Sequence, residues 1–168
     1  MKDEAKTQLA KILGDYDAKL TEAERVAQAN RAADASFPER FLASTTKVMR
    51  PALQEIATML CDSGHEATVE VQEESSSAVG GVKASAISLR LIPKPFAHKS
   101  TETSPTRIEV MFSASRAERK VIVSSTNTMI SHGGSVGKRG AYELDAVTAE
   151  VVTTHVIQTL GDAFVGSR

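Results

Sequence analysis

A glycine-rich stretch in the last third of the chain comes nearest to a known chemical motif. It reads Gly-Gly-Ser-Val-Gly-Lys-Arg-Gly over residues 133–140, and a lysine after glycines can hold phosphate groups in a nucleotide-binding loop. That motif also needs a glycine at the position of His132 and a serine or threonine at the position of Arg139. The sequence therefore argues against nucleotide hydrolysis and predicts a hairpin loop in which Lys138 and Arg139 could contact an anion.

Four histidines are the residues that could ligate a metal or act as general bases: His65, His98, His132 and His155. No two of them are four residues apart, and no histidine and carboxylate cluster has the spacing of a metal site. His155 falls on the apolar face of a predicted helix, which favours a buried, hydrogen-bonded side chain. His98 and His132 fall in predicted loops. An enzyme with a site near the glycine-rich loop is the third of our hypotheses, without an assigned catalytic residue, cofactor or metal.

The single cysteine, Cys61, excludes an internal disulfide and a cysteine-based zinc site. A chain without disulfides is typical of a reducing compartment. Cys61 lies near the predicted C-terminal end of a helix, where the helix dipole disfavours a thiolate. We therefore expect a small core residue and not a nucleophile.

Charge is distributed unevenly along the chain, although the whole chain carries a net charge of only −1. Residues 83–140 hold 10 basic and 3 acidic side chains. Two predicted turns concentrate the basic ones, namely Arg116, Arg119 and Lys120 at one and Lys138 and Arg139 at the other. These residues could bind the phosphates of a nucleic acid, or an acidic surface of the same or a second protein chain. We favour the protein partner, because aromatic residues are only 4% and no base-stacking platform is visible.

The elements that position these residues begin with a predicted helix over residues 4–33. Its apolar side chains are spaced alternately four and three residues apart, as in a heptad seam; they are Leu9, Leu13, Tyr16, Leu20, Ala23 and Ala27. A seam this short is marginal for a helix alone in water. It must therefore pack on a partner helix, either of the same chain or of a second copy.

A second helical region is predicted after a break at residues 33–38, where Ser36 could cap the new helix and Pro38 fits its first turn. The apolar face continues to Cys61. Pro51 lies inside this run, so it either kinks one helix or begins another after a short break near Met49. Gly64 is a suitable residue to end the helix.

Residues after 67 alternate between apolar and polar side chains, which predicts strands. Strands are expected around residues 69–71, 87–91, 108–114, 121–123 and 142–144, with a turn at 75–81 and a loop at 94–105. The connections are short, and this favours an antiparallel meander over parallel pairing. A final helix is predicted from an N-cap at Thr148 to Phe164, and it should cover one face of the sheet.

The whole chain has 168 residues, of which 41% are hydrophobic and 24% charged, and this excludes disordered, collagen-like and membrane-embedded classes. The predicted fold class is α+β: an antiparallel four- to five-stranded meander packed by a C-terminal helix, with an N-terminal helical arm or hairpin. We expect residues 1–36 to form the arm and 37–168 the α+β domain.

The leading functional hypothesis is a non-enzymatic protein–protein interaction or assembly module. It would be a homodimer formed through the N-terminal seam of Leu9, Leu13, Tyr16 and Leu20, with another protein partner left open. A nucleic-acid-binding module is the runner-up. No secretory signal or membrane-spanning run is visible, so we expect a cytoplasmic protein without a cofactor.

Overall fold

The structure, a computed structural model, describes residues 3–76, 81–94, 106–128 and 135–165. The chain divides into two units, residues 1–37 and residues 38–168. The first unit is helical throughout its described part, and the second contains the sheet. The predicted α+β arrangement, with its antiparallel meander and C-terminal helix, is confirmed.

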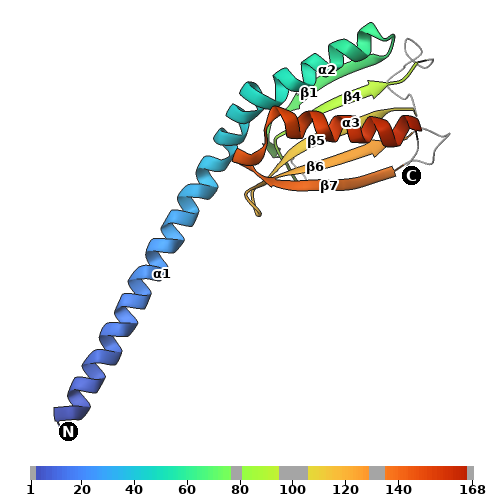
Figure 1. Cartoon of the computed structure of the whole chain (residues 1–168). Coiled ribbons are helices and arrows are strands. Elements are labelled where there is room, and N and C mark those ends of the chain that lie inside the picture. The colour runs from blue at the N-terminus through green and yellow to red at the C-terminus, as the bar shows by residue number, and fades with distance from the viewer. Residues whose placement is uncertain (1–2, 77–80, 95–105, 129–134, 166–168) are drawn as a thin grey trace. The chain divides into compact units, whose positions relative to one another are not determined.

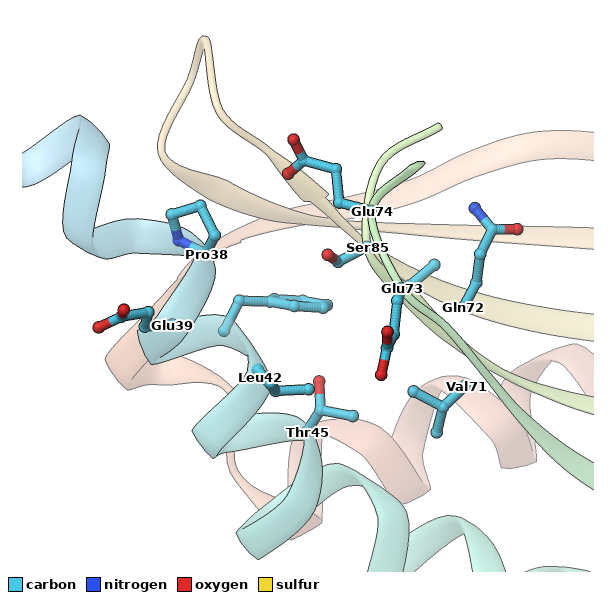
Figure 2. Close-up of a pocket in the computed structure, with 11 residues that line it drawn as sticks. Pro38, Glu39, Leu42, Thr45, Val71, Gln72, Glu73, Glu74 and Ser85 are labelled. Carbon is cyan, nitrogen blue, oxygen red and sulfur yellow. The ribbon is translucent and has the colours of Figure 1, made fainter. Parts of the chain in front are cut away.

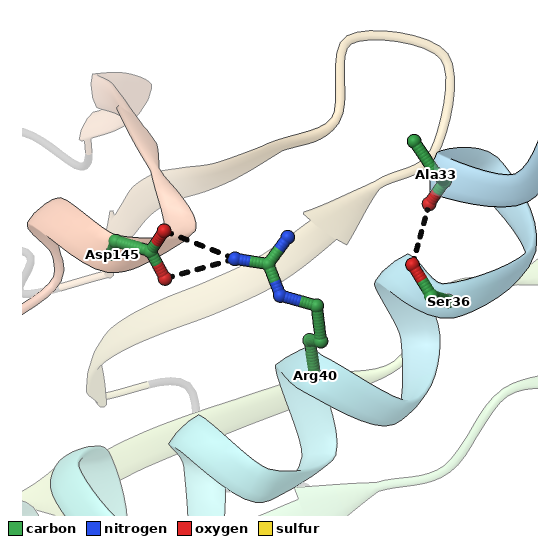
Figure 3. A network of polar contacts seen from close by, with 4 residues as sticks. All are labelled: Ala33, Ser36, Arg40 and Asp145. Carbon is green, nitrogen blue, oxygen red and sulfur yellow. Dashed lines mark hydrogen bonds and ion pairs between the residues drawn. The ribbon is translucent and has the colours of Figure 1, made fainter. Parts of the chain in front are cut away.

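Helix α1 (Asp3–Ser44) is continuous over 42 residues, so the predicted break at residues 33–38 is wrong. Ser36 does not cap a new helix, because its hydroxyl donates to the carbonyl oxygen of Ala33 at 3.1 Å (Figure 3). Pro38 lies inside the helix. A proline there removes one backbone hydrogen bond, but the alanine-rich residues before it are strong helix formers and the helix continues.

A π-helical turn, η1 (Thr45–Met49), joins α1 to helix α2 (Arg50–Asp62). The Arg50 N–H donates to the carbonyl of Thr45, five residues earlier. A proline ring clashes with the carbonyl four residues before it in a regular helix, and the wider π turn directly before Pro51 relieves that clash. A new helix does begin near Met49, as one alternative predicted, but no break separates it from the preceding residues.

Helix α2 ends where Gly64 allows it to end. Gly64 has a φ of +86°, the left-handed conformation that glycine adopts at low cost. Its N–H donates to the Cys61 carbonyl at 2.9 Å, and the His65 N–H donates to the Leu60 carbonyl at 3.0 Å. The prediction for Gly64 is confirmed. The prediction that Cys61 is a core residue is wrong, because its side chain is exposed in the last turn of the helix.

Five antiparallel strands form the main sheet in the order β1-β4-β5-β6-β7. Their bounds are β1 (Glu66–Gln72), β4 (Ala86–Ile92), β5 (Ile108–Ser115), β6 (Lys120–Asn127) and β7 (Ser135–Glu143). Each strand pairs with the next one along this order, which confirms the meander. Strands β1 and β7 are its two edges.

Two segments that were predicted as loops are strands in part. Residues Ser75–Ser76 form β2 and pair with β3 (Val82–Lys83), so the predicted turn at 75–81 begins too early. Residues 135–140 of the glycine-rich stretch belong to β7, which is therefore longer than the predicted strand at 142–144. A Cβ atom at Gly140 would lie 2.8 Å from the Tyr142 ring, so a larger residue there would displace that side chain. The remaining loop predictions, 95–105 and 131–134, lie outside the described residues.

Helices α2 and α3 (Ala149–Val165) lie on the same face of the sheet (Figure 1). On β5, Ile108, Val110 and Phe112 point toward these helices and are buried, while the residues between them are half-buried on the other face. The cap predicted at Thr148 is confirmed, since its hydroxyl accepts from the Val151 N–H at 3.3 Å. The second unit therefore builds its core between one sheet face and two helices.

A surface ion pair links the end of α1 to the 3₁₀ turn η3 (Leu144–Ala146) within the second unit. One guanidinium nitrogen of Arg40 lies 2.9 and 3.0 Å from the two carboxylate oxygens of Asp145 (Figure 3). Both side chains are exposed, so the pair contributes about 0–1 kcal/mol. Burial of Phe41 and Met49, which are at most 1% exposed, is the larger contribution to this packing.

Candidate functional site

The predicted N-terminal seam is exposed. The exposed fractions are 48% for Leu9, 53% for Leu13, 62% for Tyr16 and 47% for Leu20. A single helix cannot bury its own face, and the described part of this unit is one helix. Apolar side chains of this size are normally covered, and an exposed row of them marks an interaction surface. The seam is therefore the first candidate functional site.

Two further apolar residues widen the seam on one side. In the heptad set by the seam, Ile12 and Val26 occupy flanking positions and are 63% and 43% exposed. Lys19 and Glu24 also flank the seam, on opposite sides. Farther along, the small side chains of Ala23 and Ala27 leave a shallow groove on the helix surface. The seam of α1 thus has large apolar residues at its N-terminal end and small residues at its C-terminal end, where a partner helix could approach closely.

The first predicted basic turn connects β5 to β6 at residues 116–119. Arg116 lies 2.9 Å from a carboxylate oxygen of Glu74, and Lys120 lies 3.6 Å from one of Glu143. Arg119 has a φ of +54°, which lets the chain reverse direction. Arg116 and Lys120 are therefore paired with acids of the same chain.

Lys138 and Arg139 point to opposite faces of β7. Lys138 pairs with Ser124 on the half-buried face, while Arg139 reaches the helix side, where Ser125 is buried. Arg139 donates to the Ser125 hydroxyl at 2.7 Å and to the Asp162 carboxylate at 2.6 Å. A β-bulge between Val123 and Ser124 shifts the pairing of β6 with β7 next to these two residues. Arg139 is therefore bonded within its own chain, and an anion contact by Lys138 and Arg139 stays a prediction.

A polar cluster at the β7–α3 contact contains the buried histidine that the sequence predicted. His155 is 7% exposed, and its Nε2 lies 2.6 Å from the Tyr142 hydroxyl oxygen. Its Nδ1 has no hydrogen-bond partner among the described residues. Burial, and secondly the positive charge of Arg139, lower the pKa of His155 below its ordinary value. The neutral imidazole is thus the favoured form. Tyr142 was missed, because nothing in its sequence surroundings marks it as the partner of a histidine 13 residues later.

A small cavity was also missed by the sequence analysis. It lies in the second unit, between the last residues of α1 and the ends of strands β1 and β4 (Figure 2). Its volume is about 300 Å³, which is at the lower end for small-molecule sites. No sequence pattern indicated it, because its lining comes from the end of α1 and from residues about 30 or more positions later in the chain.

The described residues contain no group of three histidine, cysteine or acidic side chains that could hold a metal ion. His98 and His132, which the enzyme hypothesis placed near the glycine-rich loop, lie outside the described residues. Within the described part of the chain, no helix is both long and apolar enough to cross a lipid bilayer. Among known proteins, no family model, no curated sequence and no solved structure matches this chain.

Proposed function

We propose that this protein is a non-enzymatic assembly module that forms a homodimer through α1. The observation that supports the proposal is the exposed seam of Leu9, Leu13, Tyr16 and Leu20 on a helix that has no core of its own. The exposed free thiol of Cys61 fits a reducing compartment, and we place the module in the cytoplasm.

A second copy of the same helix is the partner that fits the seam best. In a two-stranded coiled coil, side chains at the seam positions pack against their counterparts on the other chain. Leucine and tyrosine at these positions bury apolar surface against themselves without leaving a charge unpaired. Full burial of one leucine stabilises the association by about 1.5–3 kcal/mol relative to full exposure, so even partial burial of four such residues per chain is substantial.

The flanking charges favour a parallel arrangement of the two helices. In a parallel dimer, Lys19 of one chain lies opposite Glu24 of the other, because these heptad positions face each other across the seam. Parallel pairing in register also places Ala23 and Ala27 against their counterparts, where their small side chains allow a close approach.

Deletion of residues 1–33 tests the proposal. We expect light scattering to report a dimer for the full chain and a monomer or an aggregate for the shortened chain, because the deletion removes the seam. A full chain that is already monomeric at high concentration would show that the seam packs within one chain, and the dimer would be wrong.

Cysteine cross-linking tests the parallel register in a Cys61→Ser background. Ala23→Cys places a thiol at the seam, and it should form an interchain disulfide under mild oxidation because the two thiols face each other. Lys11→Cys, at the heptad position opposite the seam, is the control and should not cross-link. Equal cross-linking of both variants, or of neither, would contradict a parallel dimer in register.

A further inference from the structure

The cavity beside η1 has apolar walls. Phe41 and Ala86 line it and are almost fully buried, and Leu42 and Val71 also line it. Figure 2 shows these walls formed by a helical segment on one side and the end of β1 on the other. Such walls suit methylene groups, because burial of each CH₂ is favourable by about 0.8 kcal/mol.

One buried polar atom interrupts this apolar lining. Thr45 is 2% exposed, and its hydroxyl oxygen has no hydrogen-bond partner in the described residues. Its neighbour Thr46 makes the bond that is usual for a helical threonine, donating to the Leu42 carbonyl at 3.0 Å. In Figure 2 the Thr45 hydroxyl points into the cavity. A buried hydroxyl without a partner is unfavourable, and a hydrogen bond from a ligand atom would remove that cost.

A carboxylate supplies charge at the same cavity. Glu73 directs its side chain toward the helix that forms the opposite wall (Figure 2). Its neighbour Glu74 is ion-paired with Arg116, whereas Glu73 has no ion pair among the described residues. Because the cavity lining contains three acidic residues, Glu39, Glu73 and Glu74, and no basic one, it favours a cation over an anion.

We propose that this cavity binds a linear aliphatic chain that ends in a primary ammonium group. The walls of Phe41, Leu42 and Val71 take up the methylene groups. The ammonium group has three donors and needs acceptors, and the Glu73 carboxylate and the Thr45 hydroxyl oxygen provide two of them. The ligand can be a free alkylamine or the side chain of a lysine, since both present the same chemistry.

Amide chemical shifts of the full chain provide the test, with three probes of equal chain length: n-pentylammonium, pentanol and pentanoate. We expect pentylammonium to shift the amides of Thr45, Val71 and Ala86 with a Kd on the order of 1 mM, as ligand efficiency allows for six heavy atoms. Pentanol should bind more weakly and pentanoate not at all. Equal binding of pentanoate, or no shift at these amides, would overturn the proposal.

Variants assign the binding to the two polar groups. Thr45→Val and Glu73→Gln should each raise the Kd about tenfold, because each removes a bond to a charged group. Thr45→Ser keeps the hydroxyl and should keep the affinity, and Glu55→Gln, an acid on α2 outside the cavity lining, should leave it unchanged. Undiminished binding by Thr45→Val and Glu73→Gln would contradict the proposed geometry.

A lysine derivative distinguishes the two sources of the ligand. Nα-acetyl-lysine methylamide carries the same ammonium chain on a peptide backbone. Shifts of the same amides by this compound identify a lysine side chain as the ligand, and shifts by pentylammonium alone identify a free amine. The cavity is lined by residues of the second unit, whereas the proposed dimer forms through the first. Amine binding can therefore be measured whether or not the chain dimerises.

Discussion

The two units of the chain use their apolar residues in opposite ways. Residues 38–168 contain a buried core between a sheet and two helices, with Phe112, Val123 and Leu53 fully inaccessible to solvent, although some apolar residues such as Met59 and Ile157 are exposed. The helix of residues 3–37 leaves Leu13 and Tyr16 more than half exposed. The sheet unit is therefore stabilised by contacts that it contains, while the helix requires a surface that it does not contain. This difference is why we locate assembly in the helix.

The two units also differ in the sequence separation of the residues that form their ion pairs. In the sheet unit, basic residues pair with acids distant in sequence, such as Arg116 with Glu74 and Arg139 with Asp162. In the helix, Arg25 and Glu22 form a local ion pair at 2.7 Å. Both side chains are exposed, so solvent screens this pair and it stabilises the helix only weakly.

The largest expected effect contrasts a core residue with a seam residue. Phe112→Ala should lower the free energy of unfolding of the sheet unit by about 3–5 kcal/mol at every protein concentration, because it leaves a cavity in the core. Leu13→Ala should weaken dimerisation and leave the unfolding of a dilute sample nearly unchanged. Urea denaturation followed by circular dichroism at two concentrations measures both. A large loss of stability for Leu13→Ala in dilute solution would mean that Leu13 is buried within its own chain.

A smaller effect is expected from the titration of His155 in the sheet unit. The folded pKa of His155 is lowered from the ordinary 6.5, so the unfolded chain binds a proton more readily than the folded one. Stability should be complete above pH 6.5 and should fall as the pH decreases toward the lower folded pKa. Thermal unfolding of the wild type and His155→Gln across this range measures the difference. A wild type that becomes more stable relative to the variant as the pH falls would contradict the stated direction.

The smallest effect is expected from the basic turn. Replacement of Arg116, Arg119 and Lys120 by alanine should not change binding to DNA or RNA, because we expect no such binding by the wild type. The binding is measured as retention of DNA or RNA by the immobilised wild type and by the triple variant at about 50 mM salt, where electrostatic contacts are strong. Wild-type binding that the triple variant weakens for every sequence would support the nucleic-acid hypothesis instead.

Periodicity in the sequence was sufficient to predict the kinds of elements and their order. Alternation around Val110 and Phe112 predicted a half-buried strand, and the face containing His155 predicted a buried histidine; both are confirmed. Boundaries set by single residues were less predictable. Pro38 and Ser36 are typical of a helix start, yet strong helix formers nearby keep α1 continuous.

Features that depend on distant contacts could not be predicted from local patterns. The glycines at 137 and 140 indicated a loop, but pairing with β6 makes them part of a strand. The cavity at Thr45 forms where α1 meets the end of β1, and no spacing in the sequence relates these two segments. The seam residues were predicted as a set, and dimerisation through them stays a prediction.

Sedimentation equilibrium tests dimerisation through α1 most directly. One chain has a mass of 17.9 kDa, and we expect the full chain to sediment with twice that mass at ~50 µM, above a micromolar Kd. The double variant Leu13→Glu, Leu20→Glu should sediment as a single chain, because it places like charges in the seam. A single-chain mass for the wild type at this concentration, or an unchanged dimer for the double variant, would contradict assembly through this helix.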